Sequence, residues 1–225
     1  MTSKSLKYWS KMWLETVGLS LGVALVIVVL QLGGSIDFSE SVKEVVVAQL
    51  AMFPYYLFTV AAFVIALTCV GYFQVYFSTL VSMNATRKEA AFGILGVVAA
   101  VIGFVILITV VIWNVIPGAA SSSGKKALLL FAGALFLTSA LFLILAFVMV
   151  RWGKIGSIIF MMISVLIGAG AGFCAGMGVF GNLVDMIKGL LTKFDLWWTL
   201  AIGLGAYVLT GLFILVNTRK LEVRA

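Results

Sequence analysis

Long runs without a charged residue dominate this sequence and limit what it can fold into. They cover residues 16–36, 45–86, 90–124, 127–150, 155–184 and 196–218. A helix needs about 20 apolar residues to cross the hydrocarbon core of a bilayer, and every run is long enough. Hydrophobic residues make up 64% of the chain, whereas a soluble domain has about 45–50%. We therefore predict an all-α, multi-pass membrane protein, with residues 1–225 forming a single transmembrane domain.

Six transmembrane helices are predicted from these runs, at about residues 17–33, 54–82, 90–116, 127–150, 156–181 and 196–217. Pro54 is expected to start the second span, and a tight turn at 151–154 to follow the fourth. Residues 1–15 are predicted to form an amphipathic interfacial helix, because Trp9 and Trp13 share one face and lysines another; a signal peptide is the alternative. Residues 183–195 are predicted to form an external amphipathic segment, either lying on the surface or re-entrant.

The distribution of basic residues predicts how the spans are oriented. One side carries Lys4, Lys7, Lys11, Arg87, Lys88, Arg151, Lys154, Arg219, Lys220 and Arg224. The other side carries Lys43, Lys125, Lys126, Lys188 and Lys193. The richer side, which holds every arginine, is predicted to be cytoplasmic, together with both termini. Orientation and contact with a bilayer of anionic lipid account for the net charge of +7, so no nucleic-acid partner is predicted.

A charged triplet, Arg87-Lys88-Glu89, separates the second and third spans. Charges are costly inside a bilayer, so this triplet is predicted to form the tip of a helical hairpin in water. Asn84 is a candidate left-handed cap for the first helix, and Thr86 with Glu89 has capping-box spacing for the second. The 30 residues from Pro54 to Asn84 would extend about 45 Å. The hairpin is therefore expected to project beyond the membrane; a tilted pair with an ordinary loop is the alternative.

Polar and small residues within the spans suggest two further roles. The second half of the second span contains Tyr72, Gln74, Tyr76, Ser78 and Thr79. These side chains are expected to avoid lipid, either lining a pathway or hydrogen-bonding between helices. In the fifth span, Gly168, Gly172 and Gly176 recur every four residues. Such a stripe predicts close helix packing, with a broken helix lining a site as the alternative.

Residue types needed for catalysis are scarce. The chain contains no histidine, which excludes serine–histidine catalysis and histidine metal sites. Cys69 and Cys174 both fall within predicted spans and are interpreted as inert apolar residues. The segment GAASSSGKK at 118–126 departs from the phosphate-binding loop in spacing and final residue. We therefore predict a protein that is not an enzyme and binds no cofactor or metal.

Taken together, these features resemble the permease subunit of a bacterial ATP-binding-cassette exporter of the type-two exporter superfamily, in its small six-helix form. The resemblance in topology covers the whole chain. The stretch NATRKEAAFG at 84–93 is similar to the small-residue-x-(Ser/Thr)-Arg-Lys loop of such permeases. Asn84 stands where that loop usually has glycine, and asparagine also accepts a left-handed conformation.

The resemblance implies a plasma-membrane transport subunit that pairs with a second permease copy or paralogue. A separate cytoplasmic ATPase would bind ATP and Mg and dock on the loop formed by Asn84, Thr86, Arg87, Lys88 and Glu89. Spans without buried charge favour an apolar or amphipathic substrate, such as an antimicrobial peptide, a drug (multidrug resistance) or a lipid. Two alternatives stay open: the substrate-capture subunit of a vitamin importer, and a membrane sensor or accessory subunit.

Overall fold

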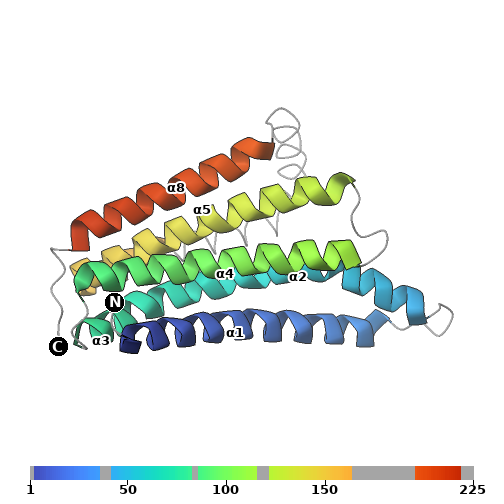
Figure 1. The fold of residues 1–225 in the computed structure, drawn as a ribbon, viewed down its shortest axis with the longest axis horizontal. Coiled ribbons are helices and arrows are strands. Elements are labelled where there is room, and N and C mark those ends of the chain that lie inside the picture. The colour runs from blue at the N-terminus through green and yellow to red at the C-terminus, as the bar shows by residue number, and fades with distance from the viewer. Residues whose placement is uncertain (1–2, 36–41, 83–85, 116–121, 164–195, 219–225) are drawn as a thin grey trace.

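The computed structural model describes residues 3–35, 42–82, 86–115, 122–163 and 196–218, and these form helices and turns without a strand (Figure 1). Helix α1 comprises Ser3–Ser35 and α2 comprises Val42–Gly71. The latter continues through a π-helical turn, η1 (Tyr72–Tyr76), into α3 (Phe77–Ser82). The remaining elements are α4 (Arg87–Val115), α5 (Ser122–Trp152), a short helix Lys154–Ile163, and α8 (Leu196–Asn217).

Five helices in the described part of the chain are long and apolar enough to cross a membrane. They cover Lys7–Gln31, Met52–Val81, Arg87–Val115, Leu128–Trp152 and Trp197–Asn217, which correspond to five of the predicted spans. The other predicted span, 156–181, begins within the helix Lys154–Ile163 and otherwise lies outside the described residues, as does the external segment 183–195. The chain therefore has the helices of a multi-pass membrane protein, and the count of six stays a prediction.

Helix α1 differs from the sequence prediction because the interfacial helix and the first span form one continuous helix. Thr16, at the predicted junction, donates its hydroxyl to the Met12 carbonyl at 2.9 Å, so this polar group is satisfied without breaking the helix. Trp9 and Met12 are buried in the bundle, with 8% and 0% of their surface exposed. The apolar face of the first turns therefore packs against protein.

Helix α2 begins well before Pro54, which lies inside the helix instead of starting it. Proline removes one backbone donor, but membrane helices tolerate it where neighbouring groups compensate. The first turns of α2 run at an angle to the rest of the helix (Figure 1). Close to the proline, the Tyr56 hydroxyl donates a hydrogen bond to the Gln31 side chain and links α2 to α1.

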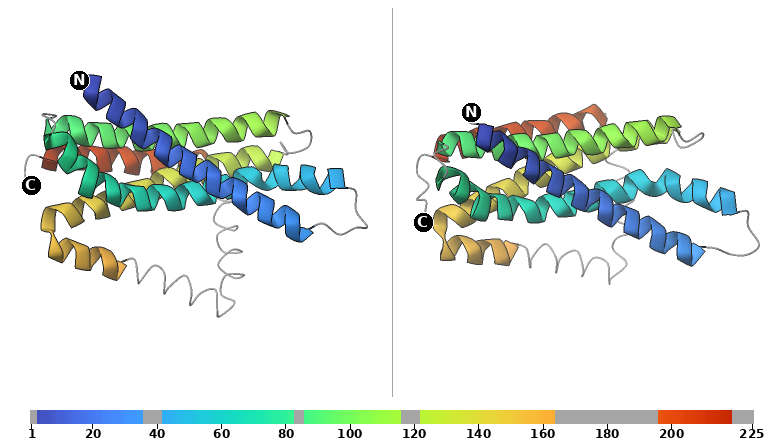
Figure 2. Two further views of the ribbon diagram at one scale, coloured as in Figure 1. Left: turned by 90° about the horizontal axis from the view of Figure 1, so that it is seen from below. Right: turned by 60° about the horizontal axis from the view of Figure 1, so that its bottom comes forward.

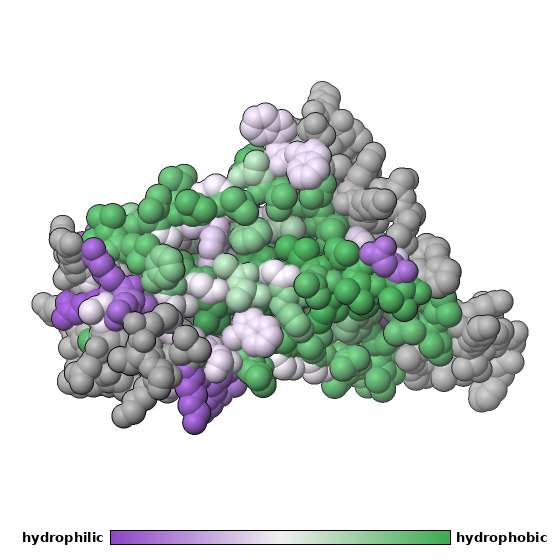
Figure 3. Space-filling view, in the orientation of Figure 1, coloured by the Kyte–Doolittle hydropathy of each residue, from purple (hydrophilic) through white to green (hydrophobic). Residues whose placement is uncertain are grey.

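The bundle is organised around α2, which packs against α1, α4 and α5, while α8 packs mainly against α5 (Figures 1 and 2). Its core consists of fully buried aliphatic and aromatic side chains, among them Leu57, Ile65, Phe73, Ile94 and Leu143. The visible surface is apolar over the middle of the bundle, and hydrophilic residues gather at the end where α4 starts and α8 ends (Figure 3). This distribution suits helices that cross a bilayer.

A glycine turn reverses the chain after α5, as predicted for residues 151–154. Gly153 has a φ of 58°, a left-handed conformation that favours glycine. The helix Lys154–Ile163 then folds back past the end of α5 (Figure 2). Gly156 permits this close approach, since a methyl group there would lie 2.5 Å from the Val148 carbonyl oxygen.

Candidate functional site

The starts of α1 and α4 and the ends of α3, α5 and α8 lie at one end of the bundle (Figure 1). Here the Tyr76 hydroxyl donates to the Glu15 carboxylate at 2.9 Å, joining η1 to α1. The Arg151 guanidinium donates to the Asn217 side-chain oxygen at 3.1 Å, joining α5 to α8. These helix ends are the ones whose charges were predicted to share the cytoplasmic side; which face of the membrane they occupy stays a prediction.

The first turn of α4 is fixed by the predicted capping box. The Thr86 backbone N–H donates to the Glu89 carboxylate at 3.0 Å, and the Glu89 N–H donates to the Thr86 hydroxyl at 3.2 Å. The Ala90 N–H also donates to the Thr86 carbonyl at 2.9 Å. These reciprocal bonds satisfy backbone donors that a helix start leaves free. They confirm the prediction made from the spacing of Thr86 and Glu89.

The tip of the hairpin lies level with the neighbouring helix ends, and its projection beyond the membrane stays a prediction. The start of α4 lies level with the ends of α5 and α8 (Figure 1). The reason is helix length: α5 has 31 residues and α4 has 29, so the neighbouring helices reach as far as the hairpin does. A partner approaching this end would therefore meet the tip together with the end of α8.

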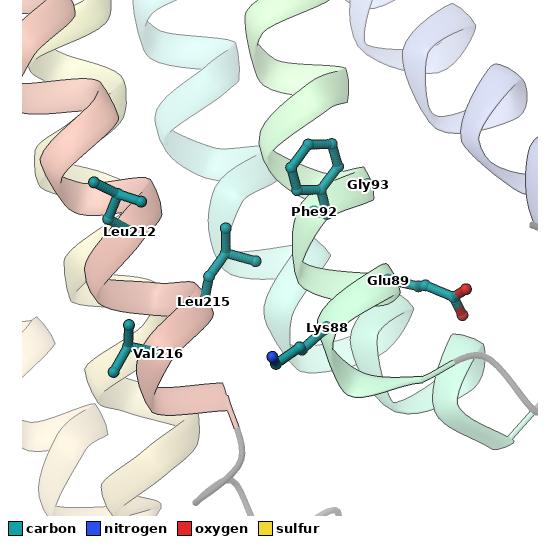
Figure 4. Close-up of a pocket in the computed structure, with 7 residues that line it drawn as sticks. All are labelled: Lys88, Glu89, Phe92, Gly93, Leu212, Leu215 and Val216. Atoms are coloured by element: carbon teal, nitrogen blue, oxygen red, sulfur yellow. The ribbon is translucent and has the colours of Figure 1, made fainter.

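An open groove of about 640 Å³ lies beside the tip, between the start of α4 and the end of α8 (Figure 4). Its walls are Lys88, Glu89, Phe92 and Gly93 from α4 and Leu212, Leu215 and Val216 from α8. The Lys88 amine points toward α8, whereas the Glu89 carboxylate points to the opposite side of α4 (Figure 4). The groove is thus mainly apolar, with a cation at its mouth.

The five polar residues predicted to line a pathway fall in and just after η1. Tyr72 is buried, hydrogen-bonds to the Thr16 hydroxyl and donates to the Met12 carbonyl at 3.3 Å. Gln74 contacts the Met149 sulfur at 3.7 Å. The Ser78 and Thr79 hydroxyls each donate to the Val75 carbonyl within their own helix, at 2.9 and 2.7 Å. The contacts of Tyr72 and Gln74 match the alternative of hydrogen bonding between helices, and a pathway role stays a prediction.

Several predicted residues lie outside the described part of the chain: Asn84 of the loop and the packing glycines Gly168, Gly172 and Gly176. The structure instead shows two close contacts that the sequence analysis missed. Gly133 of α5 meets Gly203 of α8 backbone to backbone, and Trp9 of α1 packs on Gly93 of α4. The Thr199-x-x-x-Gly203 spacing is a small-residue signal that could have identified the first contact.

Among the described residues, no three His, Cys, Asp or Glu side chains are grouped so that they could hold a metal ion. Comparison of the chain with protein-family models, with curated proteins and with solved structures finds no match. The resemblance to exporter permeases therefore stays a prediction from the expected topology and the loop sequence.

Proposed function

We propose that this chain is the permease subunit of an ATP-driven exporter in the bacterial plasma membrane, and that a separate cytoplasmic ATPase docks on the start of α4. The carrying observation is the capping box, which holds Arg87, Lys88 and Glu89 in a fixed first turn beside the ends of α5 and α8. Lys88 and Glu89 are exposed, and exposed charges contribute little to folding. A rigid, charged surface suits recognition by a partner of complementary charge.

The packing of α4 supports a role in transmitting movement. This helix runs unbroken from Arg87 at the tip to Val115. Near the tip it contacts α1 through Gly93 and Trp9. Two residues further along α4, the Leu95 carbonyl accepts a hydrogen bond of 2.6 Å from Tyr207 of α8. A displacement of the tip would therefore act on α1 and α8 together, through direct contacts.

The amino-acid sequence supports the remaining parts of the proposal, which concern ATP, the second subunit and the substrate. It has no ATP-binding motif, so ATP and Mg would bind to the ATPase subunit. A second permease copy or a paralogue would complete the path between subunits. Spans built from aliphatic and aromatic residues favour an apolar or amphipathic substrate, such as a peptide, a drug or a lipid.

The test is a variant that removes the charges of the tip but keeps its cap: Arg87→Ala, Lys88→Ala and Glu89→Gln. Glutamine can still accept the capping hydrogen bond, so the melting temperature should not change. Binding of a candidate ATPase subunit that lacks its own membrane domain, and substrate-stimulated ATP hydrolysis, should fall about tenfold, the effect of roughly 1.4 kcal/mol of lost charge complementarity.

The matched control is Lys154→Ala, which removes an exposed basic residue that follows the turn after α5 and is not part of the tip. It should leave ATPase binding unchanged. Binding and transport at the wild-type level in the triple variant would refute docking at the tip.

A further inference from the structure

We infer that the groove between the start of α4 and the end of α8 binds an anionic phospholipid, with the phosphate at Lys88 and an acyl chain along Phe92, Leu212 and Val216. This site shares Lys88 with the proposed docking surface, but lipid binding there requires no ATPase. Three features support this assignment: the shape of the groove, the charge at its mouth, and its place between two helices long enough to cross a membrane.

The groove has the size and lining of a lipid site. Its volume of about 640 Å³ falls within the roughly 300–1,000 Å³ of small-molecule sites, which are mostly apolar with a few placed polar groups. Phe92, Leu212 and Val216 are 66%, 54% and 72% exposed, so other parts of the described chain leave them largely uncovered. Both walls belong to helices apolar enough to cross a membrane, so uncovered apolar side chains on them suit contact with an acyl chain.

The charge at the mouth selects the headgroup. Within the described part of the chain, the side chain of Lys88 makes no hydrogen bond or ion pair. Its amine lies on the α8 side of α4 (Figure 4). Glu89, the carboxylate nearest in sequence, points away and accepts the Thr86 N–H at 3.0 Å (Figure 4). The cation therefore stays available for an anion, and basic pockets between membrane helices bind anionic lipid headgroups.

The order of residues along the groove matches the order of groups in a phospholipid. Lys88 precedes Phe92 by four residues, about 6 Å along α4, so the amine lies at the helix end and the ring one turn deeper. Lysine at the end of a membrane helix places its amine at the headgroup level. On α8, Val216 is next to the helix end and Leu212 lies one turn deeper. A phosphate at Lys88 would thus leave its acyl chain directed toward Phe92 and Leu212.

The experiment measures lipid binding to the purified chain by native mass spectrometry, using phosphatidylglycerol and phosphatidylcholine with identical acyl chains. Wild type should bind phosphatidylglycerol more tightly. Lys88→Ala should reduce that affinity about fivefold, the effect expected for one lysine near an anionic surface, and leave phosphatidylcholine binding unchanged. Lys88→Arg should retain the preference, and so should the control Lys154→Ala. Equal binding of both lipids by wild type, or an unchanged preference in Lys88→Ala, would overturn the proposal.

Two further variants test the groove itself. Val216→Trp fills it and should weaken binding of both lipids, whereas Leu209→Trp, at an exposed position of α8 outside the groove, should not. The alternative occupant of the groove is a second copy of the chain. A Leu212→Cys variant lacking Cys69 and Cys174 would reveal it by forming a disulfide between two copies. Disulfide-linked dimers of that variant in membranes would overturn the lipid assignment, and their absence supports it. No ATPase is present in these assays, so failure here leaves the proposed function intact.

Discussion

Glycine serves two helix contacts of this bundle in different ways. Where α5 crosses α8, both helices contribute a small residue, and the backbones of Gly133 and Gly203 touch. Where α1 crosses α4, only α4 contributes one, and the ring of Trp9 occupies the space above Gly93. The first contact joins two backbones. In the second, a large side chain occupies the space that a side chain at position 93 would otherwise take.

The difference lies in what each contact can tolerate. A methyl group at position 133 would lie 2.5 Å from the Thr199 carbonyl oxygen, an atom fixed by its own helix. A methyl group at position 93 would instead meet the Trp9 ring, which can rotate or shift at some cost. The contact between α5 and α8 should therefore be the less adaptable of the two. This ranking can be tested by the loss in free energy of unfolding that substitutions at the two contacts cause.

The largest effect is expected for Gly203→Ala, whose methyl group would meet the Gly133 carbonyl. Neither backbone can yield without separating the helices, so the free energy of unfolding should fall by about 3 kcal/mol, at the upper end of overpacking effects. Unfolding of the purified protein in mixed detergent and SDS micelles measures this. Gly205→Ala is the matched control, since nothing lies within 4 Å of a methyl group there. Similar stabilities for the two variants would contradict the contact.

A smaller loss, about 1–2 kcal/mol, is expected for Gly93→Ala, because the Trp9 ring can move aside. Replacing that ring in the double variant Gly93→Ala with Trp9→Leu should restore part of the loss, and this coupling defines a direct contact. The control is Gly96→Ala, which has open space on the same helix. Purely additive effects of the two substitutions would show that Trp9 does not pack on Gly93.

The smallest effect is expected for Tyr207→Phe, which removes the hydrogen bond to the Leu95 carbonyl between α8 and α4. Hydrogen bonds between membrane helices contribute about 0.6 kcal/mol on average, so the free energy of unfolding should fall by about that amount. Tyr55→Phe is the control, because within the described part of the chain Tyr55 makes ring contacts but no hydrogen bond through its hydroxyl. A loss larger than that of Gly203→Ala would reverse the ranking of packing over hydrogen bonding.

Sequence patterns predicted the helices well because charge avoidance in a bilayer is a strong constraint. The uncharged runs located five membrane-length helices, and the spacing of Thr86 and Glu89 located the cap of α4. Pro54 was misleading, since proline is favoured in the first turn of a helix but is also tolerated inside membrane helices. The continuity of α1 was missed because lysines and tryptophans mark an interface whether or not the helix ends there.

Helix pairing was much harder to predict than helix location. In a bilayer both lipid and protein neighbours are apolar, so hydrophobic periodicity does not indicate which face meets another helix. The 23 glycines offer many small-residue pairs, and the sequence alone does not single out Gly133 with Gly203. Gly18 and Gly22 of α1 are also four residues apart, yet among the described residues nothing lies within 4 Å of a methyl group at either position. The groove depends on pairing too, since its walls come from α4 and α8.

The π-helical turn η1 sets which face of the chain beyond it meets the core. Its hydrogen bond runs from the Phe77 N–H to the Tyr72 carbonyl, so the turn holds one residue more than an α-helical turn does. An α-helix rotates by about 100° per residue, so the same residues wound as an unbroken α-helix would turn everything beyond η1 by about that angle. Phe77 and Leu80, now buried, would then leave the core. The wide turn therefore absorbs one residue, and a chain lacking that residue could keep the same packing with an ordinary α-helical turn.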